Sequence, residues 1–108
     1  MKIIIKSTNL DVTPALREYI EEKVGSVAKF LKRWDEGDVL ELRVEVARST
    51  KHHHKGDVFY AEATLGLPHA VLRAEHEGSD IRASIDIVKD TLHREVEKYK
   101  EKQTENRR

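Results

Sequence analysis

Four segments of the chain have the composition or the spacing of β-strands. The β-branched run at residues 3–5 predicts a first strand. Residues 40–46 alternate apolar with charged side chains, which predicts a strand with one buried and one solvated face. Residues 59–67 and 70–77 predict two more strands, joined by a turn at Gly66-Leu67-Pro68-His69. Because short hairpin connections join the last three strands, we expect these strands to be antiparallel.

Two longer segments carry apolar side chains at intervals of three and four residues, the period of a helix with one buried face. In the first segment, Thr13 is the expected N-cap and Pro14 the first helical residue. We expect this helix to continue without interruption to Arg33 or Trp34. Its apolar stripe consists of Leu16, Ile20, Val24, Val27 and Leu31, widened by Tyr19 and Phe30.

The closing helix is expected to begin at Ser79 or Asp80, either of which can cap it. Its apolar stripe consists of Ile81, Ile85, Val88, Leu92, Val96 and Tyr99. From Gln103 onward the chain has no apolar residue. We therefore expect a single domain over residues 1–102 and a flexible C-terminal tail over residues 103–108.

The predicted element order is β-α-β-β-β-α. Each helix has a single apolar stripe, so both can cover the same face of a four-stranded sheet. The predicted fold class is therefore α+β, a two-layer domain with two helices on one face of the sheet and a polar, exposed face on the other. The length of 108 residues fits one such domain.

The composition narrows the class of protein. The chain has no cysteine, which excludes disulfides and thiolate zinc sites. No stretch approaches the ~20 apolar residues that span a bilayer, and no apolar run precedes a cleavage site, so we expect a cytoplasmic protein. The formal net charge is zero, whereas nucleic-acid-binding domains are usually basic overall. Charge is nevertheless uneven along the chain, and local sign decides contacts because salt screens charges beyond about 10 Å.

Patterns typical of reactive sites are weak in this sequence. The loop His52-His53-His54 can chelate a divalent metal, but three neighbours in a row rarely face one ion. The carboxylates of the closing helix, such as Asp86 and Asp90, are interleaved with cations, which is the pattern of a solvated face. The sequence has no serine elbow, glycine-rich phosphate loop or cysteine nucleophile. We therefore expect no enzyme, no catalytic residue, no bound metal and no cofactor, with a metal-responsive histidine loop in a protein-interaction module as an open alternative.

Basic side chains are the remaining candidates for function. In helical projection Arg17 and Lys29 lie away from the first apolar stripe, and Lys23 flanks it. The closing helix carries two neighbouring lines of basic side chains. The first line consists of Arg82, Lys89, His93 and Lys100, and the second of Arg94, Lys98 and Lys102. Positive surfaces of this kind can contact the phosphates of nucleic acid.

Two motifs are similar to those of a known family. The first is Thr13-x-Ala15-Leu16-Arg17-x-Tyr19-Ile20-x-x-Lys23. The second is Ala74-x-x-x-Gly78-x-Asp80-Ile81-x-Ala83-x-Ile85-Asp86-x-x-x-Asp90-x-Leu92-x-Arg94, followed by Lys98-x-Lys100-x-Lys102. Through these motifs the chain resembles the ribosome hibernation promoting factor family, which includes the ribosome-associated inhibitor of translation.

The resemblance implies a fold similar to double-stranded-RNA-binding domains and a definite partner. That partner is the ribosome, bound through ribosomal RNA of the small subunit in the channel for messenger and transfer RNA. Binding there would block translation and preserve idle ribosomes. The resemblance is to the short form of the family, whose members lack a further C-terminal domain. The resemblance implies no catalysis, no membrane and no small-molecule substrate. A general double-stranded-RNA-binding domain of similar fold is the alternative.

The resemblance also bears on individual residues. Arg82 stands where the family has a tyrosine, and arginine retains stacking while it adds charge. Ser26 and Thr91 stand where the family has lysines, and Lys89 can compensate. Basic family positions are matched in both helices. The predicted RNA-binding set is Arg17, Lys23, Lys29, Arg82, Lys89, Arg94, Lys98, Lys100 and Lys102.

Overall fold

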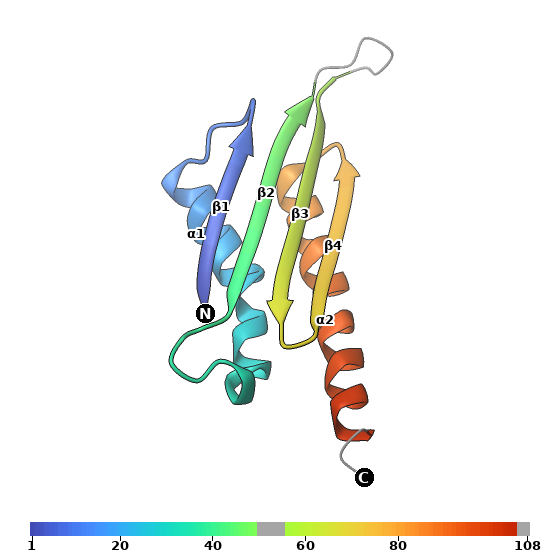
Figure 1. Ribbon diagram of the computed structural model, residues 1–108. Coiled ribbons are helices and arrows are strands. Elements are labelled where there is room, and N and C mark those ends of the chain that lie inside the picture. Colours follow the sequence, from blue (N-terminus) through green and yellow to red (C-terminus); the bar gives the residue numbers. More distant parts are fainter. Residues whose placement is uncertain (50–55, 106–108) are drawn as a thin grey trace.

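The computed structural model of the chain describes residues 1–49 and 56–105, and its elements follow the predicted order (Figure 1). The strands are β1 (Lys2–Thr8), β2 (Glu41–Ser49), β3 (Val58–Leu67) and β4 (Ala70–Gly78). The helices are α1 (Pro14–Lys23) and α2 (Ile81–Glu105). Two 3₁₀ segments, η1 (Gly25–Phe30) and η2 (Lys32–Trp34), lie between α1 and β2.

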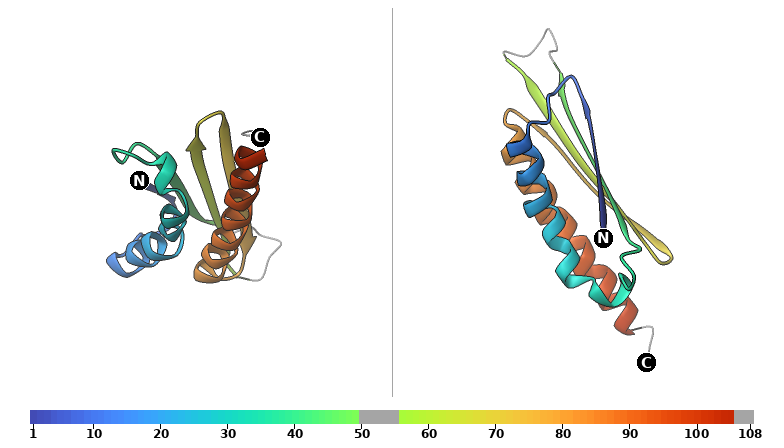
Figure 2. Two further views of the ribbon diagram at one scale, coloured as in Figure 1. Left: turned by 90° about the horizontal axis from the view of Figure 1, so that it is seen from below. Right: turned by 90° about the vertical axis from the view of Figure 1, so that its left-hand side faces the viewer.

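The strands form one mixed sheet in the order β1-β2-β3-β4. β1 and β2 are parallel, whereas β2, β3 and β4 pair in the antiparallel manner that the sequence predicts. A parallel pair requires a crossover connection, which α1 and the two 3₁₀ segments provide. Both helices cover the same face of the sheet, as the side view shows (Figure 2). The prediction of a two-layer α+β domain is confirmed.

The core lies between the sheet and the two helices. Every second residue of β2 and β3 points toward the helices, because side chains alternate between the faces of a strand. The predicted apolar stripes of the helices meet these residues. The side chains buried in this core include Ile20, Val27, Leu31, Leu42, Val44, Val46, Ala61, Ala63, Leu65, Ile85, Leu92 and Val96. Burial of one such leucine or isoleucine contributes about 1.5–3 kcal/mol to folding.

Both helices begin where the sequence predicts. The hydroxyl of Thr13 accepts a hydrogen bond from the backbone N–H of Leu16 at 3.1 Å, and Pro14 follows as the first helical residue. The Asp80 carboxylate accepts hydrogen bonds from the N–H groups of Arg82 and Ala83 at 2.8 and 3.2 Å. A carboxylate at this position also interacts favourably with the positive end of the helix dipole. The two caps fix the residue at which each helix begins.

The prediction of one uninterrupted helix to Arg33 or Trp34 is wrong. The α-helical hydrogen-bonding pattern ends at Lys23, and 3₁₀ turns continue the same path. Glycine is a poor helix former, and a Cβ atom at Gly25 would lie only 2.8 Å from Cδ1 of Ile3 in β1. The Ser26 hydroxyl donates to the carbonyl oxygen of Lys23 at 2.7 Å and so competes with the helical backbone bonds. The break brings this segment close against β1.

The closing helix is longer than predicted. α2 continues beyond Lys102 to Glu105, so part of the expected tail is helical. The rest of that tail, residues 106–108, lies outside the described residues, and its flexibility stays a prediction. No helix in the described part of the chain combines the length and the apolarity that crossing a membrane requires.

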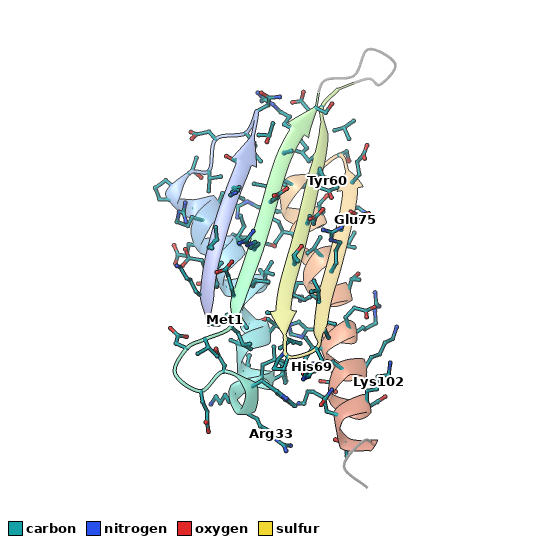
Figure 3. All side chains as sticks on the ribbon, in the orientation of Figure 1. Met1, Arg33, Tyr60, His69, Glu75 and Lys102 are labelled. Carbon is teal, nitrogen blue, oxygen red and sulfur yellow. The ribbon has the colours of Figure 1, made fainter. Side chains whose placement is uncertain are left out.

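The outer face of the sheet is polar, as predicted. One row across this face consists of Lys6, Glu45, Glu62 and Glu75, which are register partners on adjacent strands. The Tyr60 hydroxyl, in the neighbouring row, forms hydrogen bonds with the carboxylates of Glu62 and Glu75 (Figure 3). Burial raises the pKa of Tyr60, and the two carboxylates raise it further. The centre of the outer face is therefore acidic.

Candidate nucleic-acid interface

α2 runs beside α1 and η1 on the helical side of the sheet. Side chains of α2 meet side chains of α1 and η1 along one line. We call this line the helix seam. It extends from the C-terminal half of α1, which lies beside the first turns of α2, past η1 toward the C-terminal part of α2. The residues of the helix seam are Tyr19, Lys23, Ser26, Lys29, Phe30, Arg82, Asp86, Lys89, His93 and Lys100.

At one end of the helix seam, Tyr19 of α1 organises charged residues of α2. Its hydroxyl donates to Oδ1 of Asp86 at 2.6 Å, and this hydrogen bond, followed by burial, raises the pKa of Tyr19. The guanidinium carbon of Arg82 lies 4.7 Å from the centroid of the Tyr19 ring, and Nζ of Lys23 lies 5.6 Å from it. Both distances are within the range of cation–π attraction. Tyr19 therefore interacts with two cations through its ring and with the carboxylate of Asp86 through its hydroxyl.

The middle of the helix seam contains a histidine in a fixed orientation. Nε2 of His93 lies 3.1 Å from Oγ of Ser26, whose single proton is donated to the carbonyl oxygen of Lys23. His93 must therefore carry its proton on Nε2 and donate to the serine oxygen. Burial lowers the pKa of His93, and the positive charges of Lys89 and Lys29 lower it further against the opposing effect of Asp90 and Glu97. His93 is consequently neutral at pH 7.

The far end of the helix seam is aromatic. The rings of Phe30 and His93 make an edge contact, with centroids 5.3 Å apart and planes at 74°. Nζ of Lys100 lies 5.8 Å from the Phe30 centroid. Beyond Phe30, the ring of Trp34 packs against buried Tyr99, and Arg33 stands 5.6 Å from the Trp34 ring. Cations and aromatic rings are thus placed alternately along the line between the helices.

Two acidic side chains near the helix seam, Asp86 and Asp90, already have partners. Asp86 accepts the Tyr19 hydroxyl, and Oδ1 of Asp90 lies 3.2 Å from Nζ of Lys89. The distance along α2 from Arg82 to Lys100 is about 27 Å at 1.5 Å per residue. The arrangement therefore offers a long, narrow, mainly positive surface with aromatic rings, the chemistry suited to an RNA backbone and its bases.

A comparison with protein families identifies the family of the chain. The family described as "Sigma 54 modulation protein / S30EA ribosomal protein" matches residues 3–104. The chain belongs to this family. The match includes every strand and both helices of the domain almost completely, so the helix seam lies wholly within the family's shared region.

Two curated relatives have informative names. A "Ribosome hibernation promotion factor" of Lactococcus lactis subsp. cremoris (strain MG1363) is 33% identical over 100 residues, which is 93% of this chain and 50% of that protein. A protein of the same name from Staphylococcus aureus (strain COL) is 34% identical over 96 residues, which is 89% of this chain and 46% of that protein. The chain spans about half the length of these curated relatives.

Solved structures share the fold. The Thermus thermophilus Protein Y N-terminal domain matches with a TM-score of 0.64 and 28% identity, over 92% of this chain and 99% of that chain. A ribosomal subunit interface protein from Coxiella burnetii matches with a TM-score of 0.66 and 22% identity, over 93% of this chain and 98% of that chain. At this lower identity the second match supports the fold alone.

Within this family fold, the structure divides the predicted RNA-binding residues into two groups. The first group lies together at the helix seam and consists of Lys23, Lys29, Arg82, Lys89 and Lys100. The guanidinium of Arg82 lies over the ring of Tyr19. Ser26 forms the hydrogen bond that orients His93.

The second group lies away from the helix seam. Arg17 forms an i,i+4 ion pair at 3.9 Å on the exposed side of α1, and Arg94 lies on the exposed side of α2. Nζ of Lys98 is 3.6 Å from Oε1 of Glu95. Lys102 projects from the side of α2 that is turned away from α1 (Figure 3). The two basic lines predicted on α2 therefore face different directions, and only the first meets η1 and α1.

Sequence reasoning missed the aromatic part of the site. It assigned Tyr19 and Phe30 to the apolar stripe and gave Trp34 no role beyond ending a helix. It placed His93 in a basic line but not in the RNA-binding set. A signal was nevertheless present, because Tyr19 and Phe30 lie at the margin of the stripe, Tyr19 four residues before Lys23 and Phe30 three residues before Arg33.

The histidine loop predicted as an alternative metal site consists of His52, His53 and His54. Residues 52–54 lie outside the described residues, so the alternative of a metal-responsive loop stays a hypothesis. Among the residues that the structure describes, no three histidine, aspartate or glutamate side chains are grouped so that they would hold a metal ion.

The lowered pKa of His93 predicts a pH dependence of stability. The unfolded chain binds a proton at the ordinary histidine pKa of about 6.5, whereas the folded chain binds it only at lower pH. The free energy of unfolding should therefore fall as the pH decreases below about 6.5. In His93→Gln, whose amide can still donate to Ser26, this part of the decrease should be absent.

Urea unfolding at about pH 7.5 and about pH 5.5 measures this effect. His69→Gln, which changes an exposed histidine in the β3–β4 turn, is the matched control and should keep the wild-type difference between the two pH values. Equal pH dependence in the wild type and in His93→Gln would contradict the assignment of a neutral, half-buried His93.

Proposed function

We propose that the chain binds the small ribosomal subunit through the helix seam, in the channel for messenger and transfer RNA, and thereby blocks translation and preserves idle ribosomes. The observation that carries the proposal is the alignment of Lys23, Lys29, Arg82, Lys89 and Lys100 along one line between the helices. Membership of the family, and relatives that are named ribosome hibernation promotion factors, support it.

The distribution of charge supports one orientation on RNA. Phosphate contacts from lysine and arginine position a protein on RNA, and they are independent of base sequence. The helix seam offers such contacts, whereas the acidic row of Glu45, Glu62 and Glu75 on the opposite face repels phosphate. The protein should therefore bind with its helices against the RNA and the outer face of the sheet turned away. A zero net charge is compatible with this binding because charge is distributed unevenly: cations line the helix seam, and Glu45, Glu62 and Glu75 stand together on the opposite face.

The proposed activity consists of occupying a channel. It requires a rigid domain, a positive surface and a matching RNA shape, and no bond is made or broken. Accordingly the proposal includes no catalytic residue, cofactor or metal, and no small-molecule substrate or membrane. Recognition would depend on the shape and charge of folded ribosomal RNA.

Co-sedimentation tests the proposal. The purified protein is pelleted with whole ribosomes, small subunits and large subunits over a series of salt concentrations. We expect saturable pelleting with the small subunit and the whole ribosome, weakened by salt because phosphate contacts release counterions. Protein that stays in the supernatant with small subunits even at low salt would overturn the proposal. Equal affinity for naked duplex RNA and for ribosomes would instead favour a general double-stranded-RNA binder.

A further inference from the structure

Phe30 is exposed in an element that otherwise buries its apolar side chains. Val27 and Leu31, on either side of it, are 0% exposed, whereas Phe30 is 39% exposed. The backbone that carries Phe30 is held by the hydrogen bonds of η1, including that from Leu31 N–H to the Ala28 carbonyl at 3.0 Å. Phe30 is therefore an aromatic ring that rigid backbone presents at the surface.

The neighbours of Phe30 give its surroundings the chemistry of a nucleobase site. The neutral ring of His93, oriented by Ser26, supports Phe30 from the side, with centroids 5.3 Å apart. The Lys100 ammonium stands 5.8 Å from the Phe30 centroid, and Lys29 precedes Phe30 in the chain. Proteins that bind unpaired RNA use this combination, in which an aromatic ring stacks on a base and adjacent cations bind the flanking phosphates.

We propose that Phe30, supported by His93 and flanked by Lys29 and Lys100, is a stacking site for an unpaired nucleobase of the RNA bound at the helix seam. This inference rests on the proposed function and adds the class of RNA feature that the site selects. An incoming base displaces the Lys100 ammonium from the ring, and the long lysine side chain then reaches a phosphate. Bases inside a duplex are already stacked on both sides, so the site should favour single-stranded loops or bulges.

The test compares three variants in binding to small ribosomal subunits and to a short single-stranded RNA or its duplex. Phe30→Leu removes the ring but retains an apolar side chain, and Phe30→Trp retains a stacking surface. Ile87→Ala is the matched control, because Ile87 is an exposed apolar residue of α2, 41% exposed, and lies outside the helix seam. All variants are first checked for wild-type thermal stability.

We expect Phe30→Leu to weaken binding to small subunits and to single-stranded RNA by about tenfold, with an unchanged salt dependence, since stacking releases no counterions. Phe30→Trp and Ile87→Ala should bind like the wild type, and duplex RNA should bind all four proteins equally. Wild-type affinity of Phe30→Leu for both single-stranded RNA and small subunits would overturn the stacking site and leave the proposed function standing. If the wild-type protein failed to bind small subunits but bound single-stranded RNA through Phe30, the proposed function would be overturned and the stacking site would stand.

Discussion

Replacing Lys89 and Lys100 together by glutamate should lower the affinity for the small ribosomal subunit by about a hundredfold or more. Both lysines lie on the side of α2 that meets η1, one beside His93 and the other over Phe30. A hydrogen bond to a charged group contributes about 1.5–3 kcal/mol, so the loss of two phosphate contacts accounts for a factor of this size. The introduced carboxylates would also repel the RNA backbone.

The matched control is the double reversal Lys98→Glu and Lys102→Glu, which changes the net charge equally on the other side of α2. Lys98 is 73% exposed and pairs only with Glu95 at the surface, so we expect an affinity within about threefold of the wild type. The logarithmic salt dependence should become shallower by about two for the first variant and stay nearly unchanged for the second. Equal losses in the two variants would show that net charge, and not the helix seam, governs binding.

Much of the fold follows from the sequence because its hydrophobic pattern has a clear period in every element. The alternation in β2 placed Leu42, Val44 and Val46 on the core face, and the stripe of α2 placed Leu92 in the core. The break after Lys23 did not follow from this pattern. The stripe of Val24, Val27 and Leu31 stays buried in 3₁₀ turns as it would in an α-helix.

The cause of that break lies in three dimensions. The approach of Gly25 to Ile3 depends on how the crossover packs against β1, which a pattern within one helix does not contain. The same limit applies to the register of the sheet. The row of Glu45, Glu62 and Glu75 that makes the outer face acidic arises only when three strands are aligned side by side.

The sequence predicted the cations of the candidate site but not how they are arranged, because that arrangement also depends on how the helices pack. Helical periodicity correctly separated the basic residues of α2 into two lines, since it depends on one helix alone. Which line meets α1 and η1 depends on how the helices pack, so the sequence alone grouped Lys98 and Lys102 with Lys89 and Lys100. The part that each of these lysines takes in RNA binding stays a prediction. Phe30 was missed because an α-helical stripe predicts burial at its position, whereas the segment is 3₁₀, with about three residues per turn, and Phe30 is exposed.

Leu92→Ala should lower the free energy of unfolding by about 2–5 kcal/mol, a large part of the about 5–15 kcal/mol typical of a folded domain. Leu92 is 0% exposed, and α2, which carries it, packs on β3 and β4. Truncation removes buried methyl groups and leaves a cavity that the rigid sheet fills poorly. Urea unfolding measures the change, with Ile87→Ala as an exposed control in the same helix that should lose less than about 1 kcal/mol.

This variant also separates stability from recognition. Well below its melting temperature Leu92→Ala should still bind small subunits within about threefold of the wild type, since Leu92 points into the core and its neighbour His93 keeps the bond to Ser26. The Lys89 and Lys100 double variant should show the opposite, nearly normal stability with lost binding. If Leu92→Ala lost binding in proportion to its stability at low temperature, the helix seam would depend on core packing, and the effects of its cations would have to be measured in a stabilised background.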